Sequence, residues 1–215
     1  MANPNDLAQG TSSTAVNPTN YNIIIDRINE LGNRVYDVTD YGATGDGATN
    51  DITAITAAIT AATVAGGIVY FPVGVYKVAS VITVPSNVML VGAGMHVSKI
   101  IPSATMTNII TITASANNVG IYDLWVYGTG TMSTTERGFY SDTGTDIKVE
   151  RCRFENMTFG VHFATVTRGS VKGCVFYAIV GTASTSEGYG VLASLGCSQI
   201  ITSGNQFKTI ARHAV

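Results

Sequence analysis

Beyond Asn117 the chain repeats one short pattern four times. The segments NVGIYDLWVYG, TDIKVERCRFEN, TRGSVKGCVFYA and SQIITSGNQFKT align so that apolar or small residues, then Leu, Cys or Asn, then Val or Phe, fall in register. A second series, GFYSDTG, GVHFATV and GVLASLG, keeps the same phase, and the step from Gly138 to Gly160 gives a period of about 22 residues. Strands this short bury no core alone, so the repeat predicts a solenoid whose coils stack on one another.

Alternation within each repeat assigns side chains to the inside or the outside of a coil, because successive residues of a strand point to opposite faces. Equivalent residues of stacked coils then form columns with a spacing of roughly 4.8 Å. Two columns are predicted to face the core: Leu124, Cys152, Cys174 and Asn205; and Val126, Phe154, Phe176 and Phe207. Asn205 is acceptable there because an Asn amide hydrogen-bonds backbone groups at turns. Three columns are predicted to face outward: Asp123, Arg151, Gly173 and Gly204; Trp125, Arg153, Val175 and Gln206; and Tyr127, Glu155, Tyr177 and Lys208.

The three cysteines are an odd number in no metal-ligand spacing. This count argues against a disulfide framework and against a zinc site. We expect Cys152, Cys174 and Cys197 to be reduced, with the first two stacked in adjacent coils and facing the core. Neither a metal nor a cofactor is expected.

Ahead of the repeats lies the stretch DYGATGDGATNDITAITAAI, from Asp40 to Ile59. Its glycines supply turn conformations that other residues disfavour. Asn50 or Asp51 is suited to cap a helix running to about Thr63. The buried face of that helix is predicted to be Ile52, Ile55, Ile59 and Ala62. Strands are expected from about Gly67 onward, with no further helix of useful length.

Residues 1–34 are predicted to form a separate region. Met1 to Thr19 are polar and without periodicity, which is typical of a flexible tail. Ile24, Ile28 and Leu31 then share one face of a short predicted neck helix, which needs a partner because three turns are not stable alone in water. That partner is either the following domain or copies of the same helix in a parallel bundle.

Charge and hydropathy exclude two classes of partner. The formal net charge is −2, and the basic residues are scattered, so nucleic acid is not expected to bind. No apolar run approaches the roughly 18 residues of a membrane span, and the start MANPNDLAQG lacks the features of a signal peptide. We therefore expect synthesis in the cytoplasm and no membrane contact.

The segments YGATGDGATNDITAITAAI and GGIVYFPVGVYKV, between Tyr41 and Val78, resemble the first module of the pectate-lyase-like superfamily, a type common in bacteriophage tailspikes and tail appendages. The resemblance implies an all-β fold, a right-handed parallel β-helix over residues 35–215 with an N-terminal capping α-helix. The helix covers the apolar end of the first coil. Only four or five coils follow, and the sequence stops mid-pattern at FKTIARHAV. Either this is the N-terminal part of a longer spike, or something else covers the open end.

The resemblance implies two classes of function. The first is a virion tailspike or tail-fibre protein, a homotrimer that contacts other tail proteins through residues before Asn33 and binds host surface polysaccharide. The second is a polysaccharide lyase or glycosidase on the same scaffold, and the two are compatible. A third, a secreted plant-cell-wall pectinase, is disfavoured by the missing signal peptide and by the absence of a GHG motif or an Asp-Asp pair.

Candidate site residues lie on the outward columns. Trp125, Tyr127, Arg153 and Tyr177 suit carbohydrate binding, although the same aromatic residues also suit a subunit contact. A glycosidase needs two carboxyl groups, for which Asp123 and Glu155 are the candidates and Glu150 a further one. Ion pairing with the adjacent Arg151 and Arg153 is the alternative role of these carboxylates. His162 is predicted to be a solvated outward residue, and Asp46 and Asn50 either a metal or catalytic pair or, as we favour, turn and cap residues.

Overall fold

The computed structural model describes residues 34–131, 135–181, 188–194 and 196–211. The chain divides into two units, Met1–Arg34 and Val35–Val215, and the architecture below is that of the second. The predicted tail and neck helix, with the stripe of Ile24, Ile28 and Leu31, lie outside the described residues.

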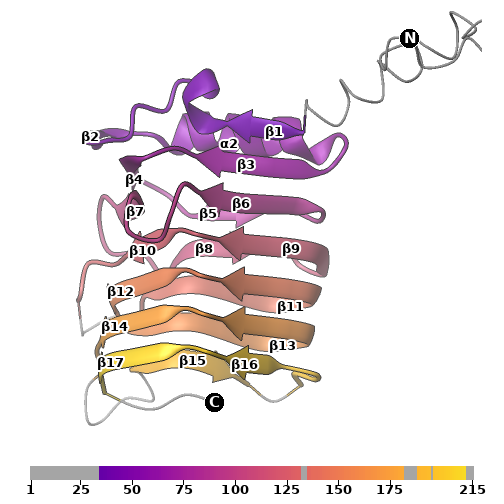
Figure 1. The fold of residues 1–215 in the computed structure, drawn as a ribbon, viewed down its shortest axis with the longest axis vertical. Helices are drawn as coiled ribbons and strands as arrows, with labels where there is room; N and C mark the ends of the chain where they lie inside the picture. Colours follow the sequence, from indigo (N-terminus) through magenta and orange to yellow (C-terminus); the bar gives the residue numbers. More distant parts are fainter. Residues whose placement is uncertain (1–33, 132–134, 182–187, 195, 212–215) are drawn as a thin grey trace, which may run out of the picture. The chain divides into compact units, whose positions relative to one another are not determined.

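The second unit is a solenoid with three faces of parallel strands, and every described pairing between its strands is parallel (Figure 1). Face 1 consists of β1 (Val35–Asp37), β3 (Gly67–Phe71), β6 (Val88–Gly92), β9 (Ala116–Tyr122), the second halves of β11 (Arg137–Glu150) and β13 (Phe159–Lys172), and β16 (Ile201–Ser203). Face 2 consists of β2 (Asp46–Asn50), β4 (Gly74–Val78), β7 (Ser98–Pro102), β10 (Trp125–Tyr127), β12 (Arg153–Met157), β14 (Val175–Ile179) and β17 (Gln206–Ile210). Face 3 consists of β5 (Ile82–Val84), β8 (Asn108–Ile112), the first halves of β11 and β13, and β15 (Tyr189–Ala193).

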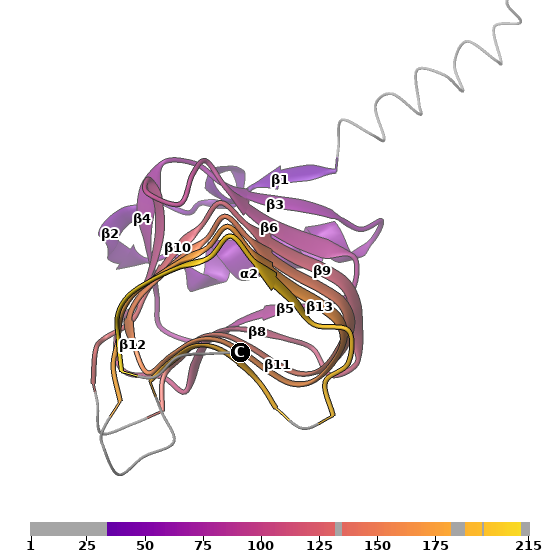
Figure 2. The ribbon, with the colours of Figure 1, turned by 60° about the horizontal axis from the view of Figure 1, so that its bottom comes forward.

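This arrangement confirms the predicted parallel β-helix and its register. Val126 pairs with Phe154, Phe154 with Phe176, and Phe176 with Phe207, as the aligned repeats require. The second repeat series forms face 3, where Phe139 pairs with Val161 and Val161 with Val191. When the solenoid is viewed with its C-terminal end toward the reader, the strands of each face overlie one another coil after coil (Figure 2).

The inward columns form the predicted core ladders. Phe154 and Phe176 stack with ring centroids 5.4 Å apart, and Phe176 and Phe207 with centroids 5.1 Å apart. Cys152 and Cys174 are free and buried in adjacent coils, as predicted, and Cys197 is free and half-buried. Parallel in-register pairing thus stacks side chains of the same kind on one another along the solenoid axis.

Asn205 ends its inward column by hydrogen-bonding the backbone, as predicted. Its Oδ1 accepts from the amide N–H of Cys174 at 2.9 Å, and its Nδ2 donates to the carbonyl of Val171 at 2.9 Å. Both groups belong to the preceding coil. The Asn205 side chain therefore stands in place of an apolar residue and compensates through two hydrogen bonds that link its coil to the preceding one.

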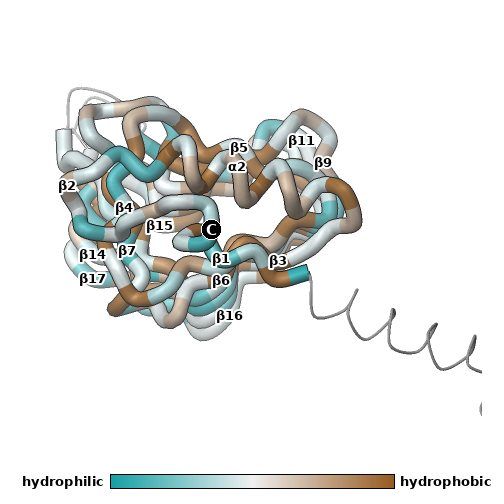
Figure 3. Tube along the Cα trace, turned by 90° about the horizontal axis from the view of Figure 1, so that it is seen from above, coloured by the Kyte–Doolittle hydropathy of each residue, from teal (hydrophilic) through white to brown (hydrophobic). Residues whose placement is uncertain are grey.

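Helix α2 (Ile52–Thr63) lies across the N-terminal end of the coils (Figure 3). Its buried residues are Ala54, Ile55, Ala58, Ile59 and Ala62. Ile52 was predicted to be buried but is only half-buried, because the first turn packs at the edge of the core. Within the described ranges no helix is long and apolar enough to cross a membrane.

The start of α2 distinguishes the two predicted cap residues. Asn50 Oδ1 accepts from the amide N–H of Ile52 at 3.4 Å, while the Asp51 side chain makes no cap bond. Asp51 instead points back to the preceding loop, where it accepts from the amide N–H of Thr44 at 2.7 Å.

The strands of the solenoid begin before the predicted start near Gly67. Strand β1 pairs with β3, and β2 pairs with β4, so the first coil precedes Gly67 and includes the 3-10 helix Val38–Tyr41. The prediction missed both strands because β1 has only three residues, and β2 is the sequence DGATN, which lacks apolar alternation. Strands of this kind form only because the next coil pairs with them.

Candidate carbohydrate-binding site

The four residues predicted for carbohydrate binding lie together on the outer side of face 2. Trp125 pairs with Arg153 in the next coil, and Tyr127 is linked to Tyr177 through the coil between them. The structure adds Lys99 of β7, which pairs with Trp125 from the coil before. These five half-buried side chains, Lys99, Trp125, Tyr127, Arg153 and Tyr177, are called the cation–aromatic face below.

Trp125 is the centre of this face because cations from both neighbouring coils contact it. Lys99 Nζ lies 4.0 Å from the centroid of the indole ring, and Arg153 Cζ lies 4.7 Å from it. Lys99 Nζ also lies 3.9 Å from the Tyr127 ring, which meets the indole edge to face at 6.2 Å. The buried indole Nε1 has no hydrogen-bond partner. A bound molecule that shifts either cation would therefore find an aromatic platform and an unused donor.

Lys99 has a lowered pKa. Burial is the main cause, and the positive charge of Arg153 adds to it, while Glu155 opposes both. The sequence prediction missed Lys99 because β7 precedes the recognised repeats. Only the pairing register of the strands, which stacks Val75, Lys99 and Trp125 in one column, reveals that Lys99 lies next to Trp125.

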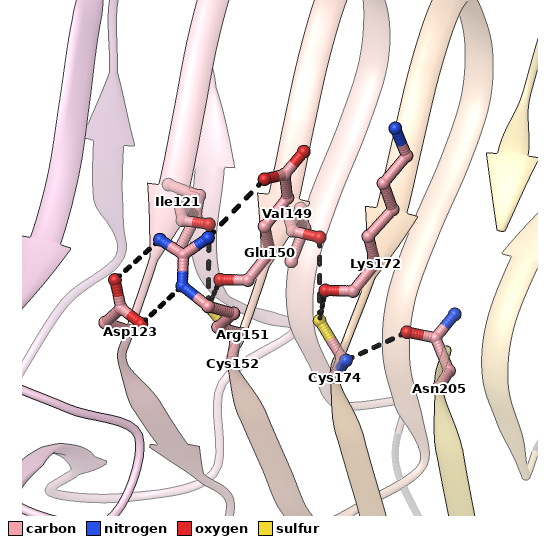
Figure 4. A network of polar contacts seen from close by, with 9 residues as sticks. All are labelled: Ile121, Asp123, Val149, Glu150, Arg151, Cys152, Lys172, Cys174 and Asn205. Carbon is pink, nitrogen blue, oxygen red and sulfur yellow. Dashed lines mark hydrogen bonds and ion pairs between the residues drawn. The ribbon is translucent and has the colours of Figure 1, made fainter. Parts of the chain in front are cut away.

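The two predicted catalytic carboxylates are held by different arginines. Asp123 accepts two hydrogen bonds from Arg151, both 2.8 Å long, and Glu150 lies 3.7 Å from the same guanidinium (Figure 4). Glu155 binds Arg153 through one oxygen, at 2.8 Å from both Nε and Nη2. No contact joins Asp123 to Glu155 among the described residues. The ion pairing that the sequence offered as an alternative role is therefore present at both positions.

One predicted outward column lies at a corner instead of on a face. Asp123, Arg151, Gly173 and Gly204 each have a positive φ, of 55°, 51°, 61° and 64°. One left-handed residue per coil turns the chain from face 1 into face 2. Alternation alone does not reveal such a residue, and the prediction therefore placed the column on a strand.

A groove of about 400 Å³ adjoins the cation–aromatic face. Its lining residues are Val75, Lys99, Ile101, Pro102, Tyr127, Gly128, Thr129 and Asn156. Behind its wall lies the fully buried Glu136, whose carboxylate accepts from the amide N–H of Thr129 at 2.8 Å. Burial raises the pKa of Glu136, against the effect of this hydrogen bond. The groove has the volume of a small-ligand site and shares Lys99 and Tyr127 with the aromatic platform.

His162 on face 3 was predicted to be solvated, and this is wrong. Its Nδ1 accepts from Arg137 Nε at 3.0 Å, its Nε2 lies 2.9 Å from Ser194 Oγ, and its ring stacks on Phe159 with centroids 5.6 Å apart. Burial, with the charge of Arg137, lowers the pKa of His162 to about 4. Because Nδ1 accepts, the neutral ring carries its proton on Nε2 and donates to Ser194. In this tautomer Nε2 of His162 already carries a proton and cannot accept one from the hydroxyl of Ser194.

Asp46 and Asn50 act as turn and cap residues. Asp46 accepts from the amide N–H groups of Ala48 and Thr49 at 2.8 and 2.7 Å, and these bonds lower its pKa to about 2. Asn50 Oδ1 also accepts from the amide N–H of Ala79 at 3.0 Å. Within the described ranges no group of three His, Cys, Asp or Glu side chains is placed to hold a metal ion.

Stacked three-faced coils with a helix across one end define a parallel β-helix of the pectate-lyase type. Residues 35–209 match the family described as Rhamnogalacturonase A/epimerase, pectate lyase-like, and the chain belongs to this family. It is 42% identical over 108 residues to the mannuronan C5-epimerase AlgE3 of Azotobacter vinelandii, a match that covers 43% of this chain and 6% of that protein.

Several solved structures are similar in fold to this chain. ORF18 of Geobacillus virus E2 is similar with a TM-score of 0.65 and 26% identity, over 86% of this chain and 38% of that one. The A-module of mannuronan C-5 epimerase AlgE6 from Azotobacter vinelandii is similar with a TM-score of 0.63 and 25% identity, over 80% of this chain and 56% of the module. The Dettilon tailspike protein shares the fold at 15% identity, with a TM-score of 0.58, over 82% of this chain and 40% of that one. This chain thus spans less than two thirds of each of these proteins.

Proposed function

We propose that this chain is part of a bacteriophage tailspike or tail fibre, located on the virion, that binds host surface polysaccharide. The observation that carries the binding role is the cation–aromatic face, where Trp125 lies between Lys99 and Arg153 beside a groove. Aromatic rings stack on the apolar faces of sugars, and ring-bound cations supply hydrogen-bond donors at the rim. The likeness to a viral protein at 26% identity over 86% of the chain supports the placement on a virion.

Binding to purified capsular or lipopolysaccharide glycans, measured by calorimetry across a panel of hosts, tests this proposal. Trp125→Ala is expected to weaken binding at least about fivefold, because an aromatic ring that stacks on a ligand contributes about 1–3 kcal/mol in the comparable case of nucleic-acid bases, and about 1.4 kcal/mol is a factor of ten. Tyr41→Ala removes an exposed aromatic ring outside this face and is the matched control. Equal losses in the two variants, or no binding of any glycan, would contradict the proposal.

A second function, modification of polysaccharide on the same scaffold, is supported by the 42% identity to a mannuronan C5-epimerase. The ion pairs of Asp123 and Glu155 disfavour these carboxylates as an acid–base pair. Incubation with mannuronan, followed by NMR of the anomeric protons, distinguishes the two functions. New uronate signals or unsaturated ends would show catalysis, whereas an unchanged polymer that still binds would favour pure adhesion.

A further inference from the structure

Two cations cover the ring of Trp125 from the neighbouring coils. Strand pairing places Lys99 in the coil before Trp125 and Arg153 in the coil after it. Lys99 Nζ lies 4.0 Å from the centroid of the indole ring, and Arg153 Cζ lies 4.7 Å from it. A sugar stacks on the indole only after one of these cations has moved, because both occupy the ring surface that stacking requires.

The two cations differ in how firmly they are held. Arg153 Nε and Nη2 each lie 2.8 Å from one carboxylate oxygen of Glu155, and these two side chains are only 23% and 13% exposed. Displacing Arg153 would leave the Glu155 carboxylate half-buried and unpaired, which is costly. Lys99 makes no hydrogen bond or ion pair with any residue that the structure describes. Lys99 is therefore the cation that a ligand displaces.

The ammonium group of Lys99 lies over two aromatic rings and lacks a counter-ion. Besides Trp125 it contacts the ring of Tyr127, whose centroid is 3.9 Å from Nζ. The lowered pKa of Lys99, with burial as its main cause, agrees with an ammonium that is partly removed from water and unpaired. Because a charge-assisted hydrogen bond to an anion adds to what the rings supply, an anionic group of a ligand would improve the surroundings of Lys99.

The groove beside Lys99 is suited to admit such an anion. Among the residues that line the groove in the described ranges, Lys99 alone is charged. Glu136 is fully buried behind the wall of the groove, and Glu155 is already paired with Arg153. A carboxylate that enters the groove thus meets a positive charge and no carboxylate of the lining.

We propose that Lys99 is the specificity-determining residue of the cation–aromatic face, because it covers Trp125 against neutral sugars and pairs with the carboxylate of an acidic sugar. This inference rests on the proposed glycan binding. A neutral sugar that stacks on Trp125 displaces the ammonium from its rings and gives it no new partner. The carboxylate of an acidic sugar accepts a charge-assisted hydrogen bond from the displaced ammonium, so the stacking and the new ion pair both favour binding.

Methyl glucuronide and methyl glucoside test this inference, because they differ only in a carboxylate that replaces a hydroxymethyl group. Trp125 is the only tryptophan of the chain, so its fluorescence follows both titrations. The wild-type chain is expected to bind the glucuronide at least about tenfold more tightly, as a hydrogen bond to a charged group predicts. Equal affinities, or no binding of either sugar, would overturn the proposal.

Lys99→Ala distinguishes this role from a structural one. The variant is expected to bind the glucuronide at least about tenfold more weakly and the glucoside about threefold more tightly, because the ring is no longer covered. A damaged fold would weaken both sugars, so the gain for the glucoside is the decisive result. Lys148→Ala, at an exposed outward position of face 1, is the matched control and is expected to leave both affinities unchanged. Equal losses for the two sugars in Lys99→Ala, or unchanged affinities, would contradict the proposal.

The contact between Lys99 and Trp125 is tested without any ligand. The fluorescence emission of Trp125 is expected to shift in Lys99→Ala and to stay unchanged in Lys148→Ala. An unchanged emission in Lys99→Ala would show that the ammonium does not cover the ring in solution. Binding of host polysaccharides is measured separately. A preference for the glucuronide without polysaccharide binding would remove the proposed function alone, and polysaccharide binding without that preference would remove this inference alone.

Discussion

At the scale of single residues, Asp51 organises the start of the solenoid. Only 2% of it is exposed, and its carboxylate accepts from the amide N–H groups of Thr44 and Gly45 at 2.7 and 3.2 Å. Its own amide N–H donates to the carbonyl of Lys77 at 2.8 Å. One residue therefore joins the loop before β2, the first turn of α2 and strand β4.

Asp51→Ala is expected to lower the free energy of unfolding by about 3 kcal/mol, because it leaves two amide donors without an acceptor. Asp40→Ala, at an exposed position eleven residues earlier, is expected to stay within about 0.5 kcal/mol of the wild type. Urea unfolding followed by circular dichroism measures both changes. Similar losses in the two variants would show that the buried hydrogen bonds do not matter.

His162 predicts a pH dependence of stability. Its pKa falls from 6.5 to about 4 on folding, so the unfolded chain binds more protons between these values. The contribution of neutral His162 to the free energy of unfolding is fully present above pH 6.5, and it is lost as the pH falls through about 4. After allowance for solvent screening of this part-exposed ring, the loss is about 1–2 kcal/mol. Melting temperatures from pH 4 to 7 are expected to fall less steeply with acidification in His162→Gln, and parallel curves would contradict the shift.

At the scale of elements, left-handed residues set the corners and bends of each coil. Asn156, Ala178 and Thr209 stand in register near the ends of β12, β14 and β17, with φ of 61°, 50° and 56°. Ala178 has neither a polar side chain nor the conformational freedom of glycine. The backbone conformation is thus imposed there by the pairing of neighbouring coils.

Ala178→Gly is accordingly expected to raise the free energy of unfolding by about 0.5–1 kcal/mol, since glycine adopts this conformation without a steric penalty. Ala164→Gly is the comparison, at a half-buried strand position without a positive φ, and is expected to destabilise by a similar amount. Thermal unfolding of both variants measures the difference. A loss of stability in both would show that Ala178 is unstrained.

Elements with internal regularity were predictable from the sequence, and those fixed by neighbouring coils were not. Alternation and the repeat were enough to predict the ladder from Val126 to Phe207 and the cation–aromatic residues of β10 to β14. They failed at β1 and β2, which lack alternation, and at Asp123 and Arg151, where one left-handed residue interrupts it. Lys99 and the bonds of His162 depend on which residue lies in the adjacent coil, which becomes known only when the register is complete.

At the scale of the whole molecule, the first and the last described coils differ in how well their apolar side chains are covered. At the N-terminal end, Ile55 is fully buried and Ile59 nearly so under α2. At the last described coil, Ile201 is 55% exposed and Phe207 is 41% exposed. Strands β16 and β17 each pair on one side only among the described residues, whereas β12 and the second half of β11 pair on both sides.

This asymmetry predicts a gradient of local stability along the axis, which hydrogen exchange measures. A solenoid opens from its ends, because each coil is stabilised by its neighbours, and a coil with one neighbour and exposed apolar side chains opens at the lowest cost. Amides of β17 are therefore expected to exchange at least about tenfold faster than those of β12 and β14, while β3, next to α2, remains protected. Ile59→Asp in α2 should uncover the opposite end, speed exchange in β3, and leave β14 unchanged. Uniform protection from β3 to β17 would mean that the chain opens as one unit, and that α2 is not the feature that distinguishes its ends.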